Sequence, residues 1–244
     1  MLLHIEFLGH VRVMVGGCED AFPLPHRSVS LLACFALSPA HQVARDVLIE
    51  RLWPDLSEKA GHHCLSSALW RLRSALTDAG RSLIVGDDNG NVGLRHGSSM
   101  WLDARALCDS IRPTLGTSGR LDAAASAGLM RGLDLYRGDL LEGHYDDWIL
   151  TERERVRSIC IRGRMRLLEH HAAGGEFDAA LDCGQEVLRL EPLREDVHRR
   201  VMEMFLLKGD RVGAHRQYAR LGALLDEELG VPPMRETRAV LERY

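Results

Sequence analysis

The spacing of apolar residues changes along the first hundred residues, and this change restricts the folds open to the chain. Apolar and polar side chains alternate at residues 5–7 and 11–15, a period of two that predicts short antiparallel strands. The period then lengthens to that of an α-helix over residues 27–37, which Pro39 ends. A second helix is predicted from about Ala44 to Trp53. Short strands followed by helices indicate a small mixed domain.

The segment GHHCLSSALWRLRSAL, residues 61–76, belongs to a third predicted helix over about residues 59–79. On a helical wheel its apolar residues share one side that must face a core, namely Leu65, Ala68, Leu69, Leu72 and Leu76. The opposite face carries His63, Ser67, Trp70 and Ser74, with Ser66 and Arg73 on one flank and Arg71 on the other. This outer face is available to a partner.

Two short β-prone runs follow in SLIVGDDNGNVGLR, residues 82–95, around an Asn89-Gly90 pair that favours a tight hairpin. Strands, three helices and a hairpin together make a winged helix-turn-helix. Beyond Gly97 the spacing predicts only helices, from Leu107 to Leu241. We therefore expect a mostly α protein with a small β component, divided into a winged-helix domain over residues 1–98 and an all-α domain over residues 99–244.

A short internal repeat, here called the 34-residue echo, indicates how the helices of the second half are arranged. GGEFDAAL from Gly174 is repeated as KGDRVGAH from Lys208, at an offset of 34 residues. That is the tetratricopeptide period, in which two antiparallel helices form each unit. Stacked pairs of this kind present a concave face for a protein or a small ligand, and the sequence does not distinguish the two.

The charge distribution points to local contact with DNA. The formal net charge is −4, so the chain is no general polycation. Between residues 59 and 81, however, there are four basic side chains and only one acidic side chain, Asp78. Arginine and serine on a helix suit base edges and phosphates. We predict a DNA-reading face on the third helix, made of Lys59, His63, Ser66, Ser67, Trp70, Arg71, Arg73 and Ser74. Arg27 and Arg95 are further candidates for DNA contact, and the alternative for both is an ordinary surface arginine.

Other interpretations of the third helix are a metal site and a solvated surface. His62 and His63 diverge by about 100° along a helix, and no carboxylate or second cysteine lies near enough to Cys64 to complete a tetrahedral site. A solvated amphipathic helix explains the serines and arginines, but it explains Trp70 poorly. No metal or cofactor is therefore expected.

Rival function classes are an enzyme and an interaction scaffold. Motifs for nucleophilic, zinc-dependent or nucleotide-dependent catalysis are absent from the sequence, so we expect no enzymatic activity. A tetratricopeptide-like scaffold that reads no DNA is the alternative function, and the first hundred residues discriminate against it. The N-terminus lacks a basic start, and no long apolar run follows, so a soluble, cytoplasmic protein without membrane contact is expected.

The chain resembles the streptomycete antibiotic regulatory protein (SARP) family, activators of the AfsR and DnrI type. The matching segments are LLHIEFLGHVRV, VLIERLWPD, LSSALWRLRSAL, GLDLYRGDLLEG and YARLGALLDEELGVPPMRE. The resemblance spans nearly the whole chain, and the last segment is the most specific.

Membership would imply a response-regulator-type winged helix joined to a bacterial transcriptional activator domain. Such proteins bind direct repeats of double-stranded DNA, two copies side by side, and recruit RNA polymerase to genes of secondary metabolism, often antibiotic biosynthesis. The resemblance also implies a polymerase contact by Asp55 and Glu58 in the PDLSEKA segment, for which a plain loop is the alternative.

Overall fold

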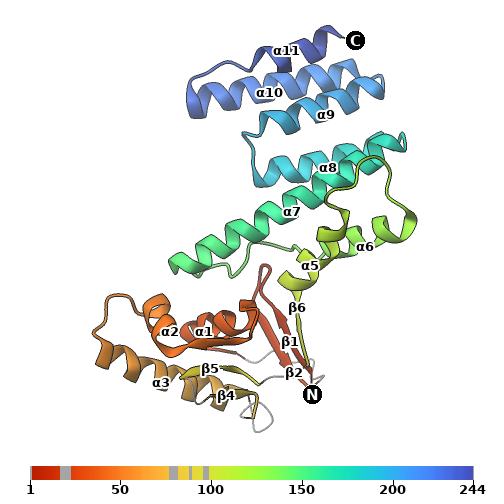
Figure 1. Cartoon of the computed structure of the whole chain (residues 1–244). Coiled ribbons are helices and arrows are strands. Elements are labelled where there is room, and N and C mark those ends of the chain that lie inside the picture. Colours follow the sequence, from red (N-terminus) through yellow and green to blue (C-terminus); the bar gives the residue numbers. More distant parts are fainter. Residues whose placement is uncertain (1, 17–22, 77–81, 88–89, 96–98, 244) are drawn as a thin grey trace. The chain divides into compact units, whose positions relative to one another are not determined.

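A computed structural model describes residues 2–16, 23–76, 82–87, 90–95 and 99–243 of the 244-residue chain (Figure 1). Contacts group these residues into two compact units. Unit 1 comprises Met1–Leu107 and Leu135–Arg157, and unit 2 comprises Cys108–Asp134 and Ser158–Tyr244. Each unit is built from two separate stretches of the chain. The domain boundary expected between residues 98 and 99 therefore remains a prediction, because units defined by contacts do not test it.

The first sheet of unit 1 contains strands β1 (Leu2–Glu6), β2 (Arg12–Val15) and β6 (Ser99–Leu102), in the order β2-β1-β6. β1 pairs antiparallel with β2, as the period of two predicts, and parallel with β6. Leu3 and Ile5 point into the core. β6 corrects the expectation that only helices follow Gly97, because four residues are too few to show an alternating pattern and a partner strand almost a hundred residues away stabilises them.

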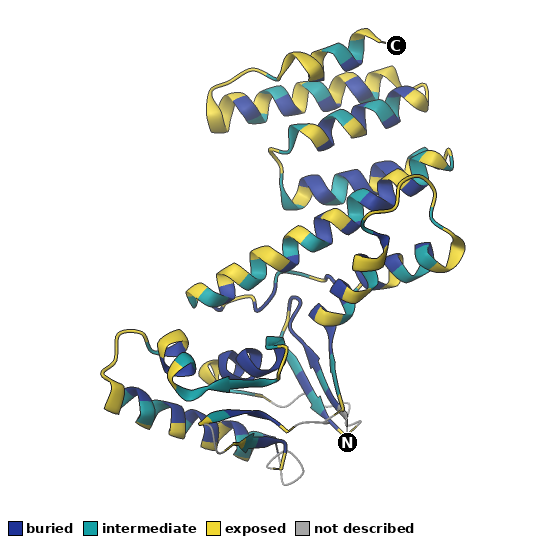
Figure 2. Ribbon diagram, viewed as in Figure 1, coloured by how far each residue is buried: buried dark blue, intermediate teal, exposed yellow. Residues whose placement is uncertain are grey.

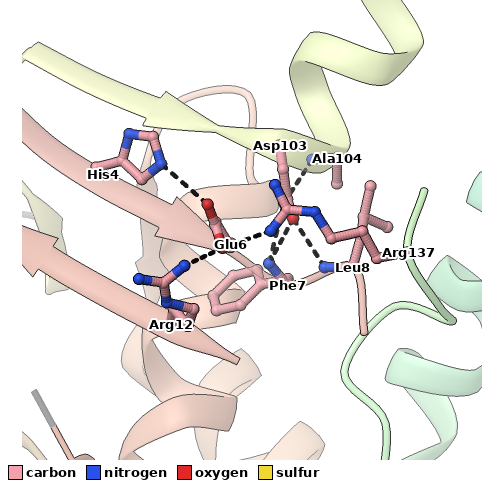
Figure 3. Close-up of polar contacts among 8 residues, drawn as sticks. All are labelled: His4, Glu6, Phe7, Leu8, Arg12, Asp103, Ala104 and Arg137. Atoms are coloured by element: carbon pink, nitrogen blue, oxygen red, sulfur yellow. Dashed lines mark hydrogen bonds and ion pairs between the residues drawn. The ribbon is translucent and has the colours of Figure 1, made fainter. Parts of the chain in front are cut away.

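Two acidic side chains hold the end of β1 (Figure 3). Asp103 begins helix α5 (Asp103–Ile111), and its carboxylate accepts backbone N–H groups of Phe7, Leu8 and Ala104 at 2.7–3.0 Å. Burial nevertheless raises the pKa of Asp103 above its ordinary value. Glu6, which is also buried, accepts hydrogen bonds from Arg137 at 3.1 Å and Arg12 at 3.5 Å. Asp103 therefore ties the end of β1 to the start of α5.

Three helices form the centre of unit 1: α1 (His26–Leu37), α2 (Arg45–Leu52) and α3 (Glu58–Ala75). Their bounds confirm the predicted helices to within a few residues. α1 is buried all round from residue 28 to residue 36, whereas the sequence predicted a single apolar side. α2 and α3 approach closely at Gly61, where an added Cβ would lie 2.4 Å from Ile49 Cγ2. Glycine at this point therefore sets the spacing of the helix-turn-helix.

A second sheet has strands β3 (Gln42–Ala44), β5 (Asn91–Leu94) and β4 (Ile84–Gly86), in that order. β4 and β5 pair antiparallel, which confirms the predicted hairpin; Asn89 of the predicted turn lies outside the described residues. β3 was not predicted from the sequence. It lies against Gly93, where an added Cβ would be 2.1 Å from the carbonyl oxygen of His41, so this strand pair requires glycine.

Residues 135–146 return to unit 1 as an irregular segment, which again differs from the helices expected there. Leu140 forms a bridge with Leu8, and the N–H of Leu141 donates to the carbonyl of Phe7 at 2.8 Å. Arg153 donates to the carbonyl oxygens of Leu140, Leu141 and His144 at 2.6–2.8 Å. Hydrogen bonds to the residues just after β1 and to Arg153 therefore take the place of helical ones.

Unit 2 is helical. It contains a 3-10 turn (Arg112–Thr114), α6 (Ala123–Leu133), residues 158–173 of α7 (Asp147–Ala173), α8 (Phe177–Leu190), α9 (Glu195–Leu207), α10 (Arg211–Leu229) and α11 (Arg235–Glu242). Gly175 and Gly209 both adopt left-handed backbone conformations, with φ of 73° and 85°, just before α8 and α10. Ala180 and Ala214 are fully buried. The 34-residue echo is thereby confirmed as a repeat of helical hairpins.

No helix in the described ranges combines the length and the apolar character that crossing a membrane requires. No group of three or more His, Cys, Asp or Glu side chains in the same ranges is arranged to hold a metal ion.

Candidate nucleic-acid interface

Helix α3 is amphipathic, and its apolar stripe faces the core of unit 1. Gly61, Leu65, Ala68, Leu69 and Leu72 are buried, and Leu76 just after the helix is buried too. α1 and α2 pack against this stripe. Because both neighbours lie on the apolar side, the polar side of α3 is left facing outward (Figure 2).

The outward side of α3 carries most of the predicted reading face. Six of its eight residues are exposed, namely Lys59, His63, Ser66, Trp70, Arg71 and Ser74, and the other two, Ser67 and Arg73, are half-buried. Ser66 is therefore more accessible than Ser67, the reverse of the helical-wheel expectation. Trp70 is 68% exposed, so most of its indole ring is open to solvent.

The charges of this face are not neutralised by described carboxylates. In the described ranges, no ion pair involves Lys59, Arg71 or Arg73; Asp78 and Arg81 lie outside them. Ser66 Oγ donates to the carbonyl of His62 at 2.9 Å, which leaves its lone pairs to accept. His62 lies 3.9 Å from Asp46 and 4.0 Å from Glu58, at the edge of the face. The face thus offers cations, hydroxyl groups and one exposed aromatic ring.

The two outlying arginines differ in how they are held. Arg95 follows β5, and its Nε donates to the carbonyl of Ser82 at 2.8 Å. Arg27 is the second residue of α1 and forms an ion pair of 2.5 Å with Asp146, which also accepts a hydrogen bond from Ser30 at 3.1 Å. Arg27 is therefore matched by a carboxylate from a distant part of the chain, whereas the side chain of Arg95 bonds only a neutral oxygen among the described residues.

Next to Arg27 lies a polar cluster that sequence reasoning missed. His144 is buried, its Nδ1 lies 3.0 Å from Ser30 Oγ, and its ring stacks on His26 with centroids 3.8 Å apart. Burial, with the nearby charge of His26, lowers the pKa of His144 to about 4. The partners are more than a hundred residues apart in the chain, so no local pattern could have revealed the cluster.

The candidate polymerase contact lies in the turn between α2 and α3. Asp55 is in this turn and Glu58 is the first residue of α3, and both side chains are exposed. Their acidic character is distinct from the basic outer face of α3. Both carboxylates are therefore accessible to a partner protein.

The helical part of the chain matches a known protein family. The model of the bacterial transcriptional activator domain matches residues 114–243, more than half of the chain. The chain belongs to the bacterial transcriptional activator domain family. The resemblance to the SARP activators is thereby confirmed, and the protein is a transcriptional regulator of that type.

Two similar proteins are also transcriptional regulators. The transcriptional regulatory protein MoaR1 of Mycobacterium bovis is 25% identical over 256 residues, covering 99% of this chain and 78% of MoaR1. MoaR1 of Mycobacterium tuberculosis is 26% identical over 259 residues, with the same coverage. Both are similar along nearly the whole of this chain.

One solved structure shares the fold. Mycobacterium tuberculosis EmbR, in complex with a low-affinity phosphopeptide, matches with a TM-score of 0.76 and 20% identity. The match covers 99% of this chain and 64% of EmbR, so this chain spans less than two thirds of that protein's length. The likeness confirms a winged helix joined to a helical domain.

Proposed function

We propose that the protein is a sequence-specific DNA-binding activator that reads the major groove with the outer face of α3. The proposal rests on the exposure of Trp70, whose side chain is 68% exposed. It lies beside exposed Arg71 on the third helix of a winged helix-turn-helix. The major groove of B-DNA admits an α-helix, and arginine bonds guanine edges or phosphates there. The residues that carry the reading are Lys59, His63, Ser66, Ser67, Trp70, Arg71, Arg73 and Ser74.

The β4–β5 hairpin would act as the wing, with Arg95 and Arg27 on phosphates. Phosphate contacts fix the register of the helix and carry no sequence information themselves. Two copies bound head to tail on direct repeats about 10 bp apart would lie on the same side of the DNA. Bound there, Asp55 and Glu58 would contact RNA polymerase, and the genes controlled would be those of a biosynthetic cluster. This part of the proposal follows the family.

The test has two steps. Footprinting first locates the operator in the DNA upstream of the genes that neighbour the gene for this protein, and a binding titration on that operator then measures affinity. Arg71→Ala and Arg73→Ala are expected to weaken binding by about 1–3 kcal/mol each if the arginine reads a base. A phosphate contact would instead lower the dependence of affinity on salt. Arg131→Ala, which removes an exposed arginine of unit 2, is the matched control. Unchanged operator binding by both α3 variants would refute the reading face.

A scaffold that reads no DNA makes the opposite prediction. In that case neither the parent protein nor the control would protect any DNA segment in the footprint. The repeats of unit 2 would then be the sole functional surface.

A further inference from the structure

Unit 2 contains a cavity of about 330 Å³ that lies between three parts of its chain. Its wall is formed by residues 161–169 of α7, by the segment Leu115–Thr117, and by Arg194 just before α9. A volume of this size is at the lower end of the range of small-molecule sites. Three arginines line it: Arg162, Arg166 and Arg194.

Arg166 is the unusual member, because its side chain is only 4% exposed and its charge is poorly matched. Its Nε donates to the carbonyl of Thr114 at 3.3 Å, and its Nη2 donates to Thr117 Oγ1 at 3.3 Å. Both acceptors are neutral oxygens. Nη1 is buried without a hydrogen-bond partner among the described residues, and the nearest carboxylate oxygen, of Glu169, is 4.0 Å away. A buried cation held in this way destabilises the fold unless something compensates its charge.

The two other arginines differ in their pairing. Arg194 is neutralised by Asp196 at 2.6 Å and by Glu191 at 3.4 Å. Arg162, one turn before Arg166 on α7, is exposed and forms no ion pair within the described ranges. Of the described lining residues, Glu169 alone is acidic, so the cavity carries an excess of positive charge. Apolar side chains complete the wall, among them Leu115, Ile161 and Met165.

We propose that this cavity binds a small organic anion, a phosphate or carboxylate group on an apolar body. The anionic group would accept hydrogen bonds from Arg162 and from the unpartnered nitrogen of Arg166, after a small movement of Glu169. Its apolar body would lie on Leu115 and Met165. Charge-assisted bonds to a guanidinium are the strong class of hydrogen bond, and the low local dielectric strengthens them further. Binding at this site does not depend on the DNA-reading proposal.

The test uses the full chain and three probes that share one ring: phenyl phosphate, phenylacetate and the neutral benzyl alcohol. Calorimetric titration at low salt is expected to show binding of at least one anion and none of the alcohol. A preference for phenyl phosphate assigns a phosphate ligand, and a preference for phenylacetate assigns a carboxylate. Failure of both anions to bind, or equal binding of the alcohol, overturns the proposal.

Variants locate the binding. Arg162→Gln alters an exposed side chain and is expected to weaken anion binding by about tenfold or more. Arg166→Met is expected to abolish binding while keeping or raising the melting temperature of the ligand-free protein, because it removes a buried charge that is poorly matched. Arg131→Gln, outside the cavity, serves as the control. If Arg166→Met fails to fold, Arg162→Gln decides, and wild-type affinity in that variant refutes the site.

Discussion

Gly61 of α3 packs so closely against Ile49 of α2 that a methyl group on Gly61 would overlap Ile49 Cγ2, at 2.4 Å. Gly61→Ala is therefore expected to destabilise unit 1 by about 1–3 kcal/mol through overpacking, less the roughly 1 kcal/mol that alanine gains in a helix. Chemical denaturation measures the net loss. Because α3 would shift outward, operator affinity should fall as well.

A double-mutant cycle identifies the cause. Ile49→Ala removes the obstructing methyl group, so Gly61→Ala should cost less in that background than in the wild type. Gly128→Ala, at a glycine of α6 where an added Cβ would meet no atom within 4 Å beyond its chain neighbours and its own helix backbone, is the control and should not destabilise. Strict additivity between residues 61 and 49 would contradict the overlap.

Arg95 and Arg27 should differ in their contribution to DNA binding. Arg95→Ala is expected to reduce the slope of log affinity against log salt by about one, as loss of one phosphate contact does. Arg27→Ala should reduce it less, because Asp146 already matches the charge of Arg27 at 2.5 Å. Titrations at several salt concentrations measure both slopes. A larger effect of Arg27 would show that its ion pair opens on DNA.

Asp55 and Glu58 should affect activation alone. The double variant Asp55→Ala/Glu58→Ala is expected to lower transcription from the target promoter in a reconstituted assay while leaving operator affinity unchanged, because both side chains are exposed and neither is basic. Asp226→Ala/Glu228→Ala, two exposed acidic residues of α10, is the matched control. A parallel loss of binding and transcription would refute the separation of roles.

The His144 cluster predicts a loss of stability in acid. The folded pKa is lowered to about 4, so the unfolded chain binds a proton near pH 6.5 that the folded chain excludes. The contribution to stability is complete above about pH 6.5 and is lost as the pH falls from there towards 4. Between about pH 7 and pH 5 the loss should be about 1–2 kcal/mol.

Denaturant unfolding of the wild type and of His144→Leu at the two pH values tests this effect. The variant lacks the titrating imidazole, so its unfolding free energy should fall less on acidification. NMR titration of the His144 ring gives the pKa directly. A midpoint close to 6.5 would contradict the burial argument.

Local patterns in the sequence predicted the parts of the fold that local interactions determine. Gly175 and Ala180 are repeated as Gly209 and Ala214 at a fixed spacing, so the helical hairpins of unit 2 could be predicted from the sequence. In the structure these glycines are left-handed and these alanines are buried. Strands β3 and β6 were not, because each has three or four residues and is stabilised by a distant partner. The irregular segment 135–146 was missed for the same reason.

The candidate interface divides in the same way. The outer face of α3 follows from helical spacing, and exposure of Trp70 agrees with that prediction. The state of Arg27 could not be predicted, because its partner Asp146 is 119 residues away in the chain. The lack of a hydrogen-bond partner for Nη1 of Arg166 could not be predicted either, because a helical pattern indicates that a residue is buried but not whether its charge is matched.

The return of residues 135–157 to unit 1 has a practical consequence for anyone who wants the winged helix in isolation. A gene shortened just after the wing would omit Leu140 and Leu141, which are fully buried, and Arg153, which holds their carbonyl groups. The shortened polypeptide would expose the surface that they cover and tend to aggregate. Deletion studies of the regulator should therefore retain the chain at least as far as Arg157.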